Sequence, residues 1–203
     1  MKHILLLVTG VAIAIGAIVS WRQCTFREES LSVNENGMNE EGLEKAYFAG
    51  GCFWGVEHQL EKLAGVLDVR SGYMGGTAEN PSYTDVSTGA TGHAETVEVT
   101  FDSARISYRE VAKRFFEIHD PTELNRQGPD VGSQYRSAVF FANDEQRLIS
   151  EQLIDILRER GYAVVTEVLS AGTFFPAEEY HQDYYEKSGS MPYCHAPVDR
   201  FGK

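Results

Sequence analysis

The sequence predicts a two-layer α+β domain in which helices cover one face of a mainly antiparallel sheet. From residue 45 onward, strand-like and helix-like segments alternate without an internal repeat or a low-complexity tract. Their order is strand, helix, strand, strand, helix, strand, helix, strand, which is typical of this class. The chain has 203 residues, enough for one domain of about 150 to 170 residues with its own core.

Each element is predicted from local signals. Ser107 and Glu110 have the spacing of a capping box, Asn143 is an N-cap, and Gly161 follows the end of its helix. The expected elements are a strand at 45–49, a helix at 53–64, strands at 65–73 and 95–101, a helix at 107–119, a strand at 136–142, a helix at 144–160, a strand at 163–169, and a partly helical aromatic segment at 174–186.

Two long polar loops interrupt this pattern. Residues 75–93 are rich in Gly, Ser, Thr, Asn and Pro and carry Tyr83, and residues 122–134 carry Asp130. Long loops inside a compact domain are usually functional. We therefore expect both loops to contribute to a site.

The N-terminal segment is predicted to be separate from the domain. Residues 4–21 form an apolar run close to the ~20 residues that cross a bilayer and longer than a usual signal-peptide core. We expect residues 1–27 to be a signal peptide or an uncleaved membrane anchor, residues 28–44 a flexible polar linker, and residues 45–203 the catalytic domain. The protein would then be membrane-anchored or secreted, with this domain on the extracytoplasmic side, where disulfides persist.

Charge and cysteine content exclude several classes of function. With 30 acidic and 18 basic residues the net charge is −12, which argues against a nucleic-acid partner and against docking on an anionic membrane surface. Cys24, Cys52 and Cys194 are too few and too far apart for a disulfide scaffold or a Cys-x-x-Cys metal site. No histidine pair has the H-x-x-x-H spacing of metal ligands, and we expect His181 and His195 to be structural or surface residues.

Cys52 lies at the turn between a predicted strand and a predicted helix. The N–H groups and dipole of a helix N-terminus favour a thiolate, so this position is expected to lower the pKa of Cys52. Phe53 and Trp54 follow directly, and at least one of them is expected to line a pocket beside the thiol. The alternative is a buried structural cysteine packed next to core aromatics, because free cysteines are often buried.

The polar side chains expected to share this site are Tyr83, Glu95, Asp130, Tyr135 and Tyr184. A thiolate beside a carboxylic acid and several phenols is suited to attack a neutral electrophile whose oxygen is protonated as it leaves. Sulfoxides and peroxides fit this description. Burial would raise the pKa of Glu95 and make it the acid, and Tyr83 and Tyr135 could donate hydrogen bonds to the developing charge.

Five motifs together resemble the A-type peptide methionine sulfoxide reductases, over about residues 45–194. The motifs are Gly51-Cys52-Phe53-Trp54-Gly55, Gly72-Tyr73-Met74-Gly75-Gly76, Gly92-His93-Ala94-Glu95, Asp130-Val131-Gly132-Ser133-Gln134-Tyr135-Arg136 and Tyr180-His181-Gln182-Asp183-Tyr184-Tyr185.

The resemblance implies a ferredoxin-like α+β core and a repair enzyme for oxidised methionine that reduces the S epimer of methionine sulfoxide, free or in proteins. It implies that Cys52 attacks the sulfoxide sulfur, that Phe53 and Trp54 hold its methyl group, and that Glu95 protonates its oxygen. Its supporting polar side chains would be Tyr83, Asp130, Tyr135 and Tyr184.

The resemblance also implies how the enzyme is recycled. Attack would leave Cys52 as a sulfenic acid, which a second thiol condenses with to give a disulfide. That thiol is best taken as Cys194, with thioredoxin, or dithiothreitol in the test tube, as reductant. We expect no bound cofactor or metal, a monomer, and no role for Cys24.

Two other functions remain open from the residues alone. A thiol peroxidase would also use a cysteine nucleophile, and a membrane-tethered redox sensor would use the Cys52–Cys194 pair without catalysis. Substrate preference separates the first from a sulfoxide reductase. The second would not need Glu95 or the Phe53-Trp54 pocket.

Overall fold

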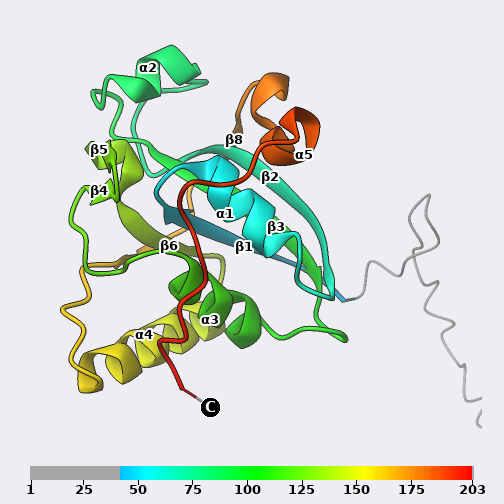
Figure 1. The fold of residues 1–203 in the computed structure, drawn as a ribbon, viewed down its shortest axis with the longest axis vertical. Helices are drawn as coiled ribbons and strands as arrows, with labels where there is room; N and C mark the ends of the chain where they lie inside the picture. The colour runs from blue at the N-terminus through cyan, green and yellow to red at the C-terminus, as the bar shows by residue number, and fades with distance from the viewer. Residues whose placement is uncertain (1–41, 203) are drawn as a thin grey trace, which may run out of the picture. The chain divides into compact units, whose positions relative to one another are not determined.

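The structure is a computed structural model that describes residues 42–202. A six-stranded sheet runs through this part of the chain (Figure 1). Its strand order is β7-β6-β1-β3-β2-β8. The strands are β1 (Leu43–Gly50), β2 (Val66–Met74), β3 (Ala94–Asp102), β6 (Ser137–Phe141), β7 (Glu167–Ser170) and β8 (Phe175–Pro176). All neighbours pair antiparallel except β6 and β7, which are parallel. The prediction of a mainly antiparallel sheet is confirmed.

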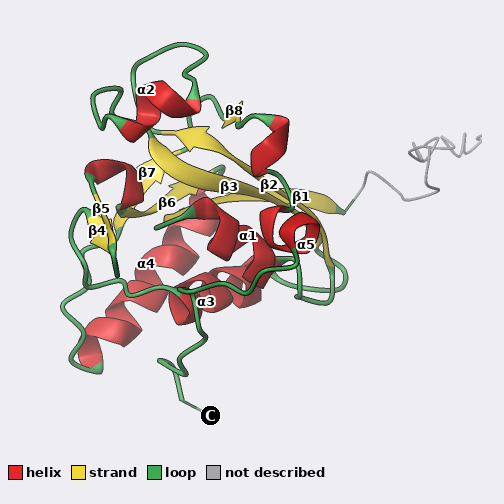
Figure 2. Ribbon diagram, turned by 45° about the horizontal axis from the view of Figure 1, so that its top comes forward, coloured by secondary structure: helices red, strands yellow, loops and turns green. Residues whose placement is uncertain are grey.

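The four central strands and two helices have the ferredoxin-like order. Helix α1 (Phe53–Leu60) connects β1 to β2, and α3 (Tyr108–Ile118) lies between β3 and β6 in the chain. With α4 (Asp144–Glu159) they form the helical layer on one face of the sheet (Figure 2). This is the split βαβ arrangement that the family resemblance implied.

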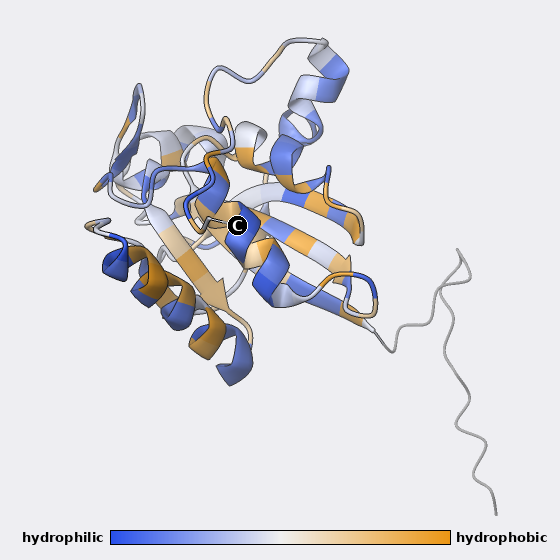
Figure 3. Cartoon of the chain, turned by 60° about the horizontal axis from the view of Figure 1, so that its bottom comes forward, coloured by the Kyte–Doolittle hydropathy of each residue, from blue (hydrophilic) through white to orange (hydrophobic). Residues whose placement is uncertain are grey.

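Apolar side chains fill the space between sheet and helices. The Phe48 and Phe115 rings stack across it with centroids 4.8 Å apart, and both are fully buried. The strands and helices carry both hydrophobic and hydrophilic residues, as amphipathic elements of a two-layer fold do (Figure 3). On the other face a smaller cluster around Met74 and Phe140 is covered by Phe174.

Several short elements interrupt the predicted loops. Loop 75–93 contains α2 (Tyr83–Ser87), and loop 122–134 contains the hairpin strands β4 (Arg126–Gln127) and β5 (Asp130–Val131). A 3₁₀ turn at Ser133–Tyr135 ends the second loop. Much later in the chain, the aromatic segment forms another 3₁₀ turn at Glu179–His181 and helix α5 (Tyr184–Ser188). Elements this short have no apolar period to reveal them in a sequence.

Two predicted elements are longer than the observed ones. The helix expected to reach residue 64 ends at Leu60, since Gly65, with φ 107°, turns the chain into β2. The strand expected from residue 163 begins at Glu167, because the Val165 N–H donates to Pro121 O and holds this segment away from β6. Hydrogen bonds outside the sheet therefore shorten the edge strand.

The N-terminal predictions mostly lie outside the described residues. Strand β1 begins at Leu43, within the segment predicted as linker. The signal peptide or anchor expected at residues 1–27 falls before the described part and stays a prediction. Between residues 42 and 202, no helix has the length and apolar character needed to cross a membrane.

The capping box of α3 leads to the first testable prediction. Ser107 accepts from the Glu110 N–H, and the Glu110 side chain accepts from the Ser107 N–H, as the sequence predicted. We expect Ser107→Ala to lower the free energy of unfolding by about 1 kcal/mol, because the Glu110 N–H loses its acceptor and the Glu110 carboxylate loses the Ser107 hydroxyl. Urea unfolding measures this. Ser87→Ala, which removes a hydroxyl bonded only to a carbonyl of its own turn, should change stability by much less.

Candidate active site

Cys52 lies between the end of β1 and the first turn of α1. Gly51 before it has φ 96°, and a Cβ there would lie 2.5 Å from the Gln127 Cβ, so both the turn and the close packing require glycine. Cys52 is the N-cap residue of α1 and is a free thiol with 6% of its surface exposed. The predicted strand-turn-helix position of this cysteine is confirmed.

Glu95 on β3 reaches this turn with its carboxyl group. Its Oε2 accepts a hydrogen bond from the Phe53 N–H at 3.1 Å, one residue from Cys52, and the side chain is buried. Burial raises the pKa of Glu95 to about 8, although the Phe53 N–H opposes the shift. The carboxyl therefore carries a proton at neutral pH, as predicted.

The thiol of Cys52 differs from the prediction. Burial raises its pKa, the negative charge of Glu95 adds to the shift, and only the Trp54 N–H lowers it. The expectation that the helix N-terminus lowers this pKa is wrong for the protein without substrate, because one amide does not offset the burial of the thiol. The resting site holds a protonated thiol beside a protonated acid.

An aromatic wall stands beside the thiol. Phe53 is almost fully buried and packs against Tyr73 and His181, with ring centroids 5.9 and 5.0 Å away. Trp54 stacks on Tyr184 with centroids 3.7 Å apart and an interplanar angle of 6°. Tyr184 therefore serves as the support of Trp54, a contact that the sequence did not reveal.

Two phenols lie within the electrostatic reach of Glu95 and Cys52. Burial and the charge of Glu95 raise the pKa of Tyr83 and of Tyr135, and the charge of Cys52 adds to both shifts. The Tyr83 N–H also donates to the Glu178 Oε1 at 2.9 Å, which anchors the start of α2 over the site. Both tyrosines are thus neutral hydrogen-bond donors close to Cys52 and Glu95.

Asp130 and the C-terminal tail complete the predicted set. The Tyr193 hydroxyl donates to the Asp130 Oδ2 at 2.9 Å, which ties the tail to β5. Cys194 is half-buried, and burial and the charge of Asp130 raise its pKa to about 12. Negative charge on Cys194 in turn contributes to the raised pKa of Cys52. The structure therefore brings the two distant thiols into one site.

Two histidines belong to the site although the sequence analysis set them aside. His181 is 1% exposed and His195 5% exposed, so neither is a surface residue. His181 Nδ1 accepts from the Trp54 Nε1–H at 3.1 Å, and His195 contacts Cys194. The available signals were the Tyr180-His181-Gln182 motif and the position of His195 directly after Cys194.

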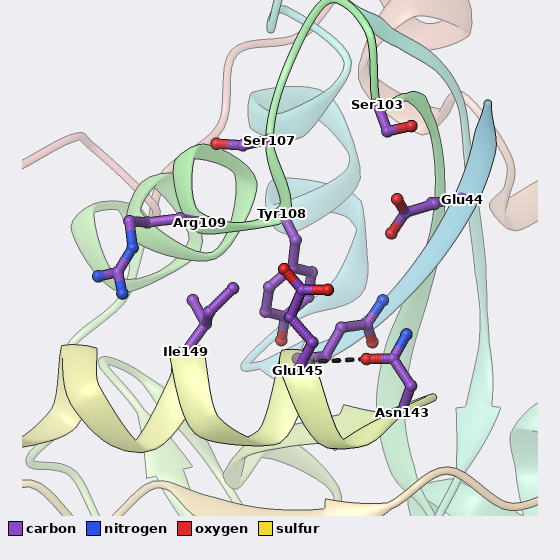
Figure 4. Close-up of a pocket in the computed structure, with 9 residues that line it drawn as sticks. Glu44, Ser103, Ser107, Tyr108, Arg109, Asn143, Glu145 and Ile149 are labelled. Carbon is purple, nitrogen blue, oxygen red and sulfur yellow. Dashed lines mark hydrogen bonds between the residues drawn. The ribbon is translucent and has the colours of Figure 1, made fainter.

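Among the residues that the structure describes, neither a metal-ligand cluster nor the surface hollow beside Tyr108 belongs to this site. No cluster of three or more His, Cys, Asp or Glu able to hold a metal ion occurs among residues 42–202. A hollow of ≈ 380 Å³ lies between the start of β1 and the N-terminal ends of α3 and α4 (Figure 4). Its Tyr108 hydroxyl bonds Ser150, and Asn143 caps α4. None of the predicted site residues lines it.

A ferredoxin-like domain that places a buried cysteine next to a protonated carboxyl has the groups that thiol-dependent enzymes use. Residues 44–202 match the family model described as "Peptide methionine sulfoxide reductase". The chain therefore belongs to the A-type peptide methionine sulfoxide reductases and is an oxidoreductase.

Relatives and solved structures agree with this family. "Peptide methionine sulfoxide reductase MsrA" of Saccharolobus solfataricus is 52% identical over 153 residues, which are 75% of this chain and 86% of the relative. "Peptide methionine sulfoxide reductase MsrA 2" of Synechocystis is 44% identical over 189 residues, 91% of this chain and 88% of the relative.

Among solved structures, reduced Mxr1 from Saccharomyces cerevisiae has a TM-score of 0.75 and 32% identity. The match covers 84% of this chain and 100% of that chain. The same yeast protein in complex with Trx2 has a TM-score of 0.55 at 22% identity, covers 84% of this chain and 100% of that one, and shows only the shared fold.

Proposed function

We propose that this enzyme reduces the S epimer of methionine sulfoxide, free or in proteins, through a sulfenic acid on Cys52. The observation that carries this proposal is the buried Glu95 carboxyl, bonded to the first amide of α1 one residue from Cys52. An acid held there can protonate an oxygen on the atom that the thiol attacks.

The first step uses Glu95 as a proton relay. The Glu95 proton moves to the sulfoxide oxygen while the Cys52 sulfur attacks the sulfoxide sulfur, and the Cys52 proton replaces the one that Glu95 gave. Methionine leaves, and the oxygen stays on Cys52 as a sulfenic acid. The oxygen atom moves from the sulfoxide to Cys52, so the sulfoxide is reduced by two electrons and Cys52 is oxidised by two. Glu95 ends the step protonated. Tyr83 and Tyr135 support this step by donating hydrogen bonds to the oxygen, and Asp130 by holding the tail through Tyr193.

The aromatic wall supplies the choice of epimer. Phe53 and Trp54 would receive the S-methyl group, with Trp54 held in place by Tyr184 and His181. If the methyl group lies there and the sulfur faces Cys52, only one epimer directs its oxygen to Glu95. In the other epimer the oxygen would enter the aromatic pocket without a proton donor, which costs binding in the transition state.

The second step regenerates the thiol. Cys194 condenses with the sulfenic acid of Cys52, and a thioredoxin-like protein reduces the resulting disulfide. The first part is supported by His195, which contacts Cys194 and bonds the Gly50 carbonyl two residues before Cys52. The complex of the related yeast Mxr1 with Trx2 supports the second part. We also propose that the enzyme is a monomer. Residues 1–27 would either hold it at the membrane or direct its secretion, and its catalytic domain would then lie on the extracytoplasmic side.

An epimer-resolved assay tests the proposed substrate. With dithiothreitol as reductant, we expect turnover of S-methionine sulfoxide and at most a small fraction of that rate with the R form. Turnover confined to the R form would refute the arrangement of methyl pocket and acid. Hydrogen peroxide consumption far above sulfoxide turnover would instead favour a thiol peroxidase.

A further inference from the structure

His195 connects the two cysteine segments through its imidazole ring. Its Nδ1 lies 2.7 Å from the Cys194 Sγ, and its Nε2 lies 2.8 Å from the Gly50 carbonyl oxygen at the end of β1. The ring is 5% exposed, so both contacts are shielded from water.

The carbonyl partner determines the tautomer of this ring. A carbonyl oxygen only accepts hydrogen bonds, so Nε2 must carry the hydrogen in this contact. In the neutral ring Nδ1 then holds a lone pair, and the Cys194 thiol is its donor. Burial lowers the pKa of His195, although the bond to the Gly50 carbonyl and the charge of Asp130 oppose this, and the lowered pKa favours the neutral ring.

The turn around Cys52 leaves room for this ring. A Cβ at Gly51 would lie 3.3 Å from the His195 Nε2, and one at Gly55 would overlap its Nδ1. His195 itself has φ 68°, a left-handed conformation that is uncommon for a histidine. The packing of the glycine turn against the ring holds a strained residue in place.

We propose that His195 is the general base that takes the proton of Cys194 when its sulfur attacks the sulfenic acid of Cys52. This inference rests on the proposed function, in which Cys194 resolves that sulfenic acid. The S–H bond of Cys194 and the S–O bond of Cys52 break, and a Cys52–Cys194 disulfide forms. The departing hydroxide takes the proton from the imidazolium, so water is released and His195 returns to its neutral form. Cys194 is oxidised and Cys52 is reduced from sulfenic acid to disulfide.

A glutamine at this position separates the two functions of the ring. The Gln side chain of His195→Gln can still donate from its Nε2 to the Gly50 carbonyl, so it can keep the tail anchored, but it cannot accept a proton. We expect disulfide formation about 100-fold slower than in the unmodified protein, as for loss of a general base. His58→Gln, a matched change on α1, should form the disulfide at the unmodified rate.

The measurement is a single turnover with S-methionine sulfoxide and no reductant, followed by mass spectrometry. In His195→Gln, the Cys52 sulfenic acid should accumulate and be trapped by a 1,3-dione. Disulfide formation at the unmodified rate would overturn the inference and leave the proposed function intact. If the unmodified protein itself forms no Cys52–Cys194 disulfide, the resolving role of Cys194 fails, and the base role fails with it.

A second measurement needs no variant and decides the matter if His195→Gln does not fold. Nitrogen-15 NMR of the reduced protein at pH 7 should show His195 as the neutral Nε2–H tautomer. A ring protonated at Nδ1 would have no lone pair for Cys194 and would overturn the inference.

Discussion

Glu95→Gln is expected to lower the rate of methionine formation by about 100-fold or more, the usual loss when a general acid is removed. The substitution keeps an acceptor for the Phe53 N–H, so the turn at Cys52 should keep its shape. What is lost is the proton for the sulfoxide oxygen. Rapid-quench measurement of methionine in the first turnover tests this directly, because regeneration of the thiol does not enter that rate.

The same strand offers a matched control. Glu98 is also a buried carboxyl on β3, but it pairs with Lys45 at 3.0 Å and lies on the opposite face of the strand from Glu95. Glu98→Gln should leave the first turnover close to normal. Full activity in Glu95→Gln would show that another group supplies the proton and would remove Glu95 from the proposed mechanism.

The pH dependence of stability gives an independent signature of Glu95. Its folded pKa of about 8 lies above the ordinary value of 4.5, so folding favours the protonated form. The stability contributed by this group is present below pH 4.5 and is lost as the pH rises toward and through 8. A glutamine has no charge to bury, so Glu95→Gln should flatten this loss in denaturant unfolding measured between pH 5 and 9.

Local signals account for the parts of the fold that were predicted correctly. The capping box of α3 joins Ser107 to Glu110, and the N-cap of α4 joins Asn143 to Gln146. Each signal spans four residues of the sequence, so it marked its helix without knowledge of the fold. Where a boundary depends on a distant group, prediction failed. Val165 leaves the sheet for the carbonyl of Pro121, and no pattern in 163–169 records that partner.

The site shows the same division between local and distant causes. The sequence placed Cys52 at a helix N-terminus, but the raised pKa of its thiol depends on burial and on Glu95. The supports of Trp54 are His181 and Tyr184, more than a hundred residues away along the chain. Motifs could name the residues that gather here, whereas their electrostatic state and mutual contacts are properties of the folded chain.

Cys194→Ser is expected to abolish thioredoxin-driven cycling while preserving the first turnover. Cys52 can still attack the sulfoxide, so the variant should release about one methionine per enzyme molecule without reductant. Its sulfenic acid then has no partner thiol, because a serine hydroxyl does not form a disulfide. Methionine release followed over time with thioredoxin and its reducing system should show a burst and then no steady rate.

Cys24 provides the matched control for this experiment. It is the one cysteine of the chain besides Cys52 and Cys194. We expect it to take no part in the cycle, so Cys24→Ser should cycle with thioredoxin at the normal rate. Undiminished cycling in Cys194→Ser would remove Cys194 from the mechanism. It would also mean that thioredoxin attacks the Cys52 sulfenic acid directly, which the burial of that thiol beneath the glycine turn and the tail argues against.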